Sequence, residues 1–315
     1  MSDALLLPDK VRCGMVLAGG SREHITQFAP AIEAAGFDSA WVGDHISFYI
    51  PILESLTLLS FTAAITEKVE LCTGVYLLPL RHPTLAAKVT STLDVLSGGR
   101  LKLGIGVGGE FPPEFEANAV PVEERGPRTD ESIEVLRRLW TEDSVEHRGE
   151  HFSFGPVSID PKPLQAGGPP IIVGGRRGPT FRRAGQSGDG YISHMCSADQ
   201  YARNMASIRD HAEKAGRVGD AFEPATFIFT LFDESYEAAL DRAAEMLQRI
   251  YNVPFRDAAA KYCLLGRPED CLEQMQTFVE AGSRHIVLSM LSDPNEAIEI
   301  ARDGVLPELH ALNLR

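Results

Sequence analysis

Two short segments combine residue types that could do chemistry on a bound ligand. The first, PIIVGGRRG (170–178), runs from an apolar stretch into two glycines and two arginines, and Pro179 then favours the start of a helix. Free backbone N–H groups at a helix start, together with guanidinium groups, suit a phosphate. The alternative is that the glycines only make a tight turn and the arginines are solvated. The predicted phosphate site consists of Gly174, Gly175, Arg176 and Arg177.

The second segment is Asp44-His45, which directly follows the apolar run SAWVG (39–43). An imidazole titrates near neutral pH, so it can exchange a proton with a reacting group. The alternative is a structural His45 that only pairs with Asp44. We predict both as catalytic residues, with His45 as the proton donor or acceptor.

A glycine-rich segment, GIGVGGE (104–110), fits the spacing G-x-G-x-x-G. It follows the fourth apolar run instead of the first, and Phe111-Pro112-Pro113 stands where a helix should begin. We therefore reject a dinucleotide-binding fingerprint. Its small residues, Gly106 and Gly108 among them, are interpreted as letting a planar ring approach the chain.

Other catalytic and metal motifs are absent from the sequence. It has no Walker A loop, no G-x-S-x-G elbow and no H-E-x-x-H. His147 and His151 are four apart but lie across an expected hairpin, so helical ligand spacing does not apply. The five cysteines are odd in number, widely separated and never in a C-x-x-C pair, which predicts buried thiols without a metal site or a disulfide framework.

Composition restricts the partners. The 315 residues are 44% hydrophobic and 23% charged, with a net charge of −14. Nucleic acid or an anionic membrane surface would need a basic footprint, so neither is expected. No stretch approaches the roughly 20 apolar residues of a membrane helix. The first 14 residues lack a basic leader and a cleavage site, which predicts a cytoplasmic protein.

The elements that position these residues follow from a repeated switch between short apolar runs and amphipathic stretches, typical of βα units. Expected strands are 12–17, 39–43, 69–75, 101–107, 170–175, 189–193, 225–230 and 285–290. Expected helices include 25–35, 51–65, 84–96, 129–140, 198–215, 235–250 and 268–281. Eight strands with intervening helices predict an α/β fold, a (β/α)8 TIM barrel. We predict one domain over 1–315, with loop insertions near 111–127 and 143–169, the second beginning with a hairpin.

In such a barrel the working residues come from the carboxyl ends of the strands. The predicted walls of a substrate pocket there are Phe48, Tyr49, Tyr76, Phe111 and Met195. They indicate a partly apolar small-molecule substrate. The expected helix 51–65 is apolar on more than one face, which predicts a homodimer contact.

Taken together, these segments resemble the luciferase-like superfamily of flavin- or deazaflavin-dependent oxidoreductases. The matching segments are 34–45, 73–108, 124–140, 161–175 and 184–193. The resemblance implies a TIM-like barrel that binds coenzyme F420, an 8-hydroxy-5-deazaflavin, or alternatively FMN, with its ring over the strand ends.

The resemblance also implies roles for particular residues. A bulge with a non-prolyl cis peptide would fall at Gly74-Val75 and support the ring, and the coenzyme phosphate would lie on Gly174, Gly175 and Arg176. Asp44 and His45 match the Asp-His pair after strand two of many deazaflavin members. Some members carry a catalytic Glu after the strand-four glycines, but here the register offers Gly109 or Glu110, so the role of Glu110 stays open.

Three functions remain from the sequence. The leading hypothesis is hydride transfer between F420 and a small organic substrate, with His45 exchanging the proton. The alternative is an FMN-dependent monooxygenase of the two-component kind, supplied by a separate reductase. The third is a flavin-binding protein without turnover.

Overall fold

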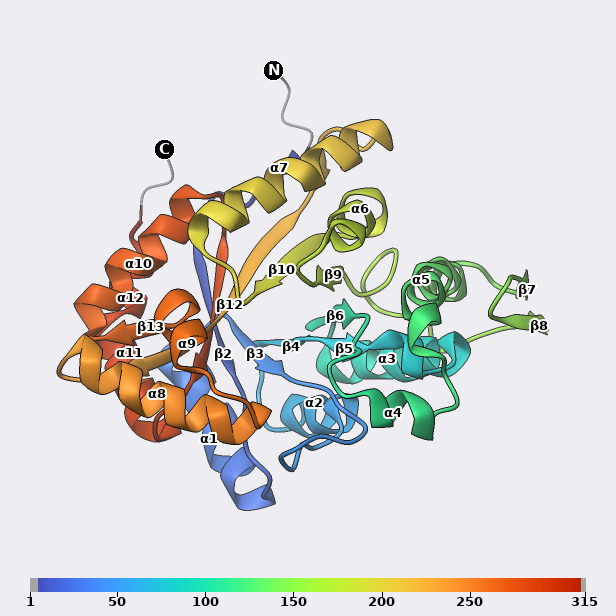
Figure 1. The fold of residues 1–315 in the computed structure, drawn as a ribbon. Helices are drawn as coiled ribbons and strands as arrows, with labels where there is room; N and C mark the ends of the chain where they lie inside the picture. Colours follow the sequence, from blue (N-terminus) through green and yellow to red (C-terminus); the bar gives the residue numbers. More distant parts are fainter. Residues whose placement is uncertain (1–4, 313–315) are drawn as a thin grey trace.

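The computed structural model describes residues 5–312 and contains a closed barrel of eight parallel strands surrounded by helices (Figure 1). In order around the barrel the strands are β2 (Arg12–Val16), β3 (Ser39–Val42), β4 (Glu70–Thr73), β6 (Leu101–Gly106), β9 (Ile171–Gly174), β10 (Gly190–His194), β12 (Glu223–Phe232) and β14 (His285–Met290). β10 pairs with both β9 and β12, and β14 pairs with β2, so the sheet has no open edge. The predicted (β/α)8 barrel is confirmed.

Each barrel strand lies where a short apolar run predicted one. Parallel strands are covered by helices outside and by side chains inside, so they read as continuous apolar runs between turns. The largest difference is β12, which begins two residues earlier and ends two residues later than expected.

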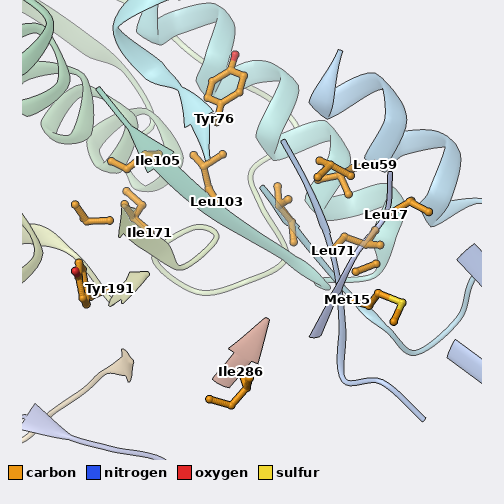
Figure 2. Close-up of a cluster of buried hydrophobic side chains, with 14 of the residues drawn as sticks. Met15, Leu17, Leu59, Leu71, Tyr76, Leu103, Ile105, Ile171, Tyr191 and Ile286 are labelled. Carbon is orange, nitrogen blue, oxygen red and sulfur yellow. The ribbon is translucent and has the colours of Figure 1, made fainter. Parts of the chain in front are cut away.

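The helices between the strands form the outer layer. They are α1 (Arg22–Ala35), α2 (Ser55–Ala63), α3 (Pro83–Ser97), α5 (Arg125–Thr141), α6 (Gly178–Ser187), α7 (Ala198–Lys214), α8 (Tyr236–Tyr251), α10 (Pro268–Glu280) and α11 (Pro294–Gly304). Shorter elements are β1 (Leu5–Leu6), β5 (Tyr76–Leu77), η1 (Leu78–Leu80), β11 (Asp220–Ala221), α9 (Arg256–Tyr262), β13 (Leu264–Gly266) and α12 (Leu306–His310). The main core lies between strands and helices, where side chains such as Met15, Leu71 and Ile286 are buried (Figure 2).

The barrel interior is apolar at its centre and polar toward the amino ends of the strands. Trp41 fills the centre and is fully buried, with Cys72, Ile172 and Val287 around it. From its indole N–H a chain of polar contacts runs to the amino ends, and we call it the interior ladder. Its members are Trp41, Ser39, His285, Glu223, Lys102, Glu70 and Arg12.

Two expected boundaries are corrected by the structure. The stretch 111–127 is not a loop: it holds α4 (Pro112–Ala117) and η2 (Val122–Glu124), and α5 already begins at Arg125. Prolines stand in the first turn of α4, where their missing N–H groups cost no hydrogen bond. The helix expected from Pro51 starts at Ser55, because the carboxylate of Glu54 caps it by accepting from the N–H groups of Leu56 and Thr57.

The second insertion contains the expected hairpin. β7 (Val145–Arg148) and β8 (Ser153–Val157) pair antiparallel and project beyond α3 and α5 in Figure 1. The carboxylate of Glu131 on α5 anchors the turn by accepting from the backbone N–H groups of His151 and Phe152. Across residues 5–312, no helix is both long and apolar enough to cross a bilayer.

Candidate active site

The carboxyl ends of the barrel strands form a mouth at which apolar interior side chains are only half-buried. Val16 on β2, Val75 after β4 and Phe227 on β12 are partly exposed, whereas the interior residues below them are buried. His194, the last residue of β10, is also half-buried here and lies edge-on to the ring of Phe227, with 5.3 Å between ring centroids. The mouth therefore has an apolar floor that a flat ligand could contact.

His45 stands beside this floor, in the loop that follows β3, and its ring is held from two sides. Its Nδ1 lies 3.2 and 3.3 Å from the carboxylate oxygens of Glu114 on α4, and Glu114 is fully buried. The ring of Phe48 stacks on the imidazole with 4.0 Å between centroids and 16° between planes. His45 thus pairs with Glu114. The alternative interpretation, in which His45 pairs with its neighbour Asp44, is not what the structure shows.

Glu114 was not among the residues predicted from the sequence. Its carboxylate also accepts from the backbone N–H of Ile46, 3.1 Å away, so it fixes the loop as well as the ring. With Nδ1–H of a neutral His45 donating to Glu114, the lone pair lies on Nε2. Nε2 is then the atom able to exchange a proton with a ligand.

Asp44 is buried in contacts of a different kind. Arg81 binds it with both terminal nitrogens, at 2.7 and 2.8 Å, and the backbone N–H of Leu77 and the hydroxyl of Ser55 donate to it. The guanidinium of Arg81 in turn lies 4.5 Å from the centroid of the Tyr76 ring. Asp44 therefore ties the β3 loop to the segment after β4, and its oxygens face protein donors.

The peptide bond between Gly74 and Val75 is cis, as the family resemblance implied. The side chain of Val75 reaches across to β6 and β9. A Cβ placed on Gly106 would lie 2.3 Å from one methyl of Val75, and a Cβ on Gly174 2.5 Å from the other. These two glycines make a slot for Val75. Gly106 and Gly174 therefore make room for the side chain of Val75.

The loop after β9 carries the predicted phosphate residues at the surface. Gly175 has φ +144°, and a Cβ there would strike the hydroxyl of Thr180, so glycine is needed. Arg177 is the exposed N-cap of α6, and no side chain caps that end. Arg176 is also exposed and pairs with Glu110 at 3.3 Å. The glycine of the neighbouring loop, Gly108, has φ +61° and packs close to Phe115.

The predicted pocket walls separate into three groups. Phe48, Tyr49 and Phe111 come together, with centroid distances of 5.0 to 6.0 Å. Met195 is half-buried against the cluster around Phe229 on β12, at the mouth but not in this group. Tyr76 is only 3% exposed, lies beneath Arg81 and does not join the other predicted pocket residues.

Three further residues complete the site and were not among the predicted site residues. Besides Glu114, they are Tyr251 at the end of α8, 6.1 Å from Phe48 between centroids, and His194. Burial, and to a smaller extent the charge of Arg176, lower the pKa of His194 to about 4, so its ring is neutral at physiological pH. His194 directly follows the sixth predicted strand, 189–193, and that position was the available signal. Within 5–312 no three His, Cys, Asp or Glu side chains converge as a metal site, and Cys13, Cys72, Cys196, Cys263 and Cys271 are buried free thiols.

The chain is a (β/α)8 barrel, and the carboxyl ends of its strands carry an imidazole–carboxylate pair, an apolar floor and an arginine-bearing helix start. Barrel enzymes place their ligand sites at this end of the strands. Comparison with known proteins gives the family. The family model described as luciferase-like monooxygenase matches residues 1–285, and the chain belongs to this family.

Relatives differ in how much they share. An uncharacterised protein of Mycobacterium tuberculosis is 33% identical over 184 residues, which cover 52% of this chain and 62% of the relative. F420-dependent glucose-6-phosphate dehydrogenases are 26% identical in Amycolatopsis mediterranei, covering 91% of this chain and 95% of the relative, and 27% identical in Nocardia farcinica, covering 93% and 95%.

Solved structures show the same fold. An F420-dependent secondary alcohol dehydrogenase, in complex with an F420-acetone adduct, superposes with a TM-score of 0.85 at 22% identity, covering 95% of this chain and 99% of that one. The oxygenating constituent of 3,6-diketocamphane monooxygenase from Pseudomonas putida, in complex with FMN, has a TM-score of 0.76 at 19% identity, covering 97% and 100%.

Proposed function

We propose that the chain is an F420-dependent oxidoreductase that transfers a hydride to or from a small organic substrate. The observation that carries the proposal is the pairing of His45 with buried Glu114 beside the apolar floor at the barrel mouth. Relatives that align over more than 90% of this chain are named as F420-dependent dehydrogenases, which supports this choice of coenzyme. Bound F420 supplies the hydride chemistry.

In this proposal the protein's own groups bind, orient and move a proton. Nε2 of His45 takes a proton from a substrate hydroxyl during oxidation, and returns it to the oxygen in the reverse direction. Glu114 holds the ring so that Nε2 faces the mouth, and its negative charge stabilises the imidazolium. Because the oxygens of Asp44 already accept from protein donors, we assign Asp44 a positioning role.

The residues present fit a flavin-like coenzyme. Val75, seated in its slot, and Val16 offer apolar contact for a planar ring. No side chain caps the start of α6, and the backbone N–H of Gly178 there follows Gly175, Arg176 and Arg177 in the chain, which suits a phosphate. We propose that this loop binds the coenzyme phosphate, with Arg176 exchanging its partner Glu110 for it.

The same loop would serve FMN, and structures named as monooxygenases share the fold, one of them in complex with FMN. An FMN-dependent monooxygenase that relies on a separate reductase is therefore the second candidate. Titration of the purified protein with F420 and with FMN, followed by fluorescence, distinguishes them. We expect saturable binding of F420. Tight FMN binding without F420 binding would replace the proposal with the second candidate.

Turnover tests the third possibility, a binding protein. We expect His45→Ala to lower the rate with F420 by about a hundredfold or more, the range of general acid–base catalysis, while F420 still binds. Unchanged turnover in His45→Ala would remove the assigned role of this residue. Absence of any redox activity with either coenzyme would make a binding protein the better description.

We also propose a homodimer located in the cytoplasm. The support for a dimer is a set of exposed apolar side chains on α2, α3 and the turns beside them. They are Leu53, Phe61, Leu85, Leu96 and Leu164. Light scattering should give twice the chain mass, and a monomer mass would refute the dimer.

A further inference from the structure

A cluster of four aromatic rings begins at Phe48, the ring that stacks on His45, and we call this cluster the aromatic box. Its rings are Phe48, Tyr49, Phe111 and Tyr251. They come from three separate loops or helix ends, after β3, after β6 and at the end of α8. Each ring meets its neighbour edge to face, with interplanar angles of 62° to 84°. Tyr49 is still 50% exposed, so the box is open to ligands at its rim.

The box continues into the barrel as an aromatic and aliphatic surface. Tyr251 lies 6.2 Å from the ring of Phe229, which in turn lies 5.4 Å from Phe227 at the barrel mouth. Burial raises the pKa of Tyr251 well above its ordinary value, so its hydroxyl stays protonated. A ligand that lies against Phe48 would therefore meet further aromatic rings in the direction of Tyr251 and Phe229.

The aromatic box itself contains no charged side chain, because its members are two phenylalanines and two tyrosines. Beside it, Glu114 pairs with His45 and accepts from the backbone N–H of Ile46, and the exposed Arg176 pairs with Glu110. His194 is neutral because its pKa is about 4. A phosphate monoester brought against these four rings would lose its water without gaining a cation from the box, and burial of an unpaired charge is costly.

We propose that the substrate is an uncharged molecule with an apolar or aromatic body and a single hydroxyl or carbonyl group, and that this chain does not use a sugar phosphate. The proposal deepens, and rests on, the oxidoreductase function proposed above. The body contacts the aromatic box, and the oxygen atom is the group within reach of His45. Relatives named as glucose-6-phosphate dehydrogenases align over most of the chain, so the proposal separates this chain from them in substrate class.

The test is ligand binding to the full chain by saturation-transfer NMR, with benzyl alcohol, cyclohexanol and glucose 6-phosphate as probes. It is run without coenzyme and with F420 present. We expect saturable binding of the first two probes and none of the third. Phe48→Ala and Phe111→Ala should each weaken binding by about tenfold, the scale for loss of one buried aromatic contact.

Controls separate the box from general effects. Tyr236→Ala is the matched control, because Tyr236 is 42% exposed on α8 but lies outside the box, and binding should not change. If Phe48→Ala does not fold, as judged by circular dichroism, Phe48→Leu keeps the bulk and removes the ring. Its binding should fall between those of the wild type and Phe111→Ala.

Two results would overturn the proposal: binding of glucose 6-phosphate with an affinity equal to that of the neutral probes, or neutral-probe binding that the box substitutions leave unchanged. The proposed function fails by a different result. If F420 does not bind but benzyl alcohol still binds at the box, the coenzyme assignment is wrong and the ligand class stands.

Discussion

Nδ1 of His45 lies 3.2 Å from a carboxylate oxygen of Glu114, a residue 69 positions further along the chain and fully buried on α4. The contact joins the loop after β3 to the helix after β6. A carboxylate behind an imidazole selects the tautomer and stabilises the protonated ring, so it acts on proton transfer without touching a ligand.

Glu114→Gln should lower kcat by about 10- to 100-fold with little change in KM, because the amide keeps the volume but not the charge. The 15N chemical shifts of the His45 ring should show a changed tautomer population in the variant. Glu116→Gln, on the exposed side of the same helix, is the control and should match the wild type. An unchanged tautomer in Glu114→Gln would contradict the positioning role.

Asp44→Ala should destabilise the fold by about 3 kcal/mol, because it leaves the guanidinium of Arg81 buried without its partner. Urea unfolding followed by circular dichroism measures this free energy of unfolding. Asp241→Ala removes an exposed ion pair with Arg256 and should cost less than about 1 kcal/mol. If Asp44→Ala lost activity but kept full stability, Asp44 would have a chemical role.

Gly174→Ala should destabilise the barrel by about 1–3 kcal/mol, because the new methyl group would overlap a methyl of Val75. The double variant Gly174→Ala/Val75→Ala should cost less than the sum of the two single variants, since shortening Val75 removes the overlap. A double-mutant cycle in urea measures the coupling. Additive effects would show that Val75 does not fill the slot.

Acid should destabilise the fold through Glu223 in the interior ladder. Burial alone would raise the pKa of Glu223, but the hydrogen bond with His285 and the charges of Lys102 and Arg12 lower it well below the ordinary value. A carboxyl with a lowered folded pKa stabilises the fold above its unfolded pKa of about 4.3, and this stabilisation is lost as the pH falls further.

Urea midpoints measured between pH 2 and pH 7 should therefore fall steeply below about pH 4.3 in the wild type. Glu223→Gln should be less stable at pH 7 and show a flatter decline. Exposed Glu308→Gln is the control, with the wild-type slope. If the urea midpoints of Glu223→Gln and the wild type fell equally steeply with pH, Glu223 would not be the cause of the loss of stability in acid.

The barrel could be predicted from the sequence because each buried parallel strand leaves a local apolar signal between turns. Runs such as PIIVGG and HIVLSM fall on β9 and β14, and strand order in a closed barrel follows chain order. The boundaries of α2 and α5 were less predictable, since capping by Glu54 and the short helices before α5 depend on local contacts.

The site was only partly predictable, for a physical reason. His45 and the loop after β9 could be predicted from their residue types and from their position after a strand. Glu114 and Tyr251 do not, because each becomes part of the site only when a distant helix packs beside the mouth. Asp44 shows the opposite case: its type suggested chemistry, but its partner Arg81, 37 positions away, gives it a structural environment.

The interior ladder also bears on how the strands align. Its charged members stand at the amino ends of β2, β4, β6 and β12 and face inward, where each finds an opposite charge on another strand. A slip of one residue in any of these strands would turn its charge outward, toward the apolar helix layer. The ladder thus favours the native alignment of the strands over alignments shifted by one residue. It does so at the amino ends of the strands, far from the mouth. We therefore expect the alignment of the strands to be kept when loops at the mouth are exchanged for those of a relative.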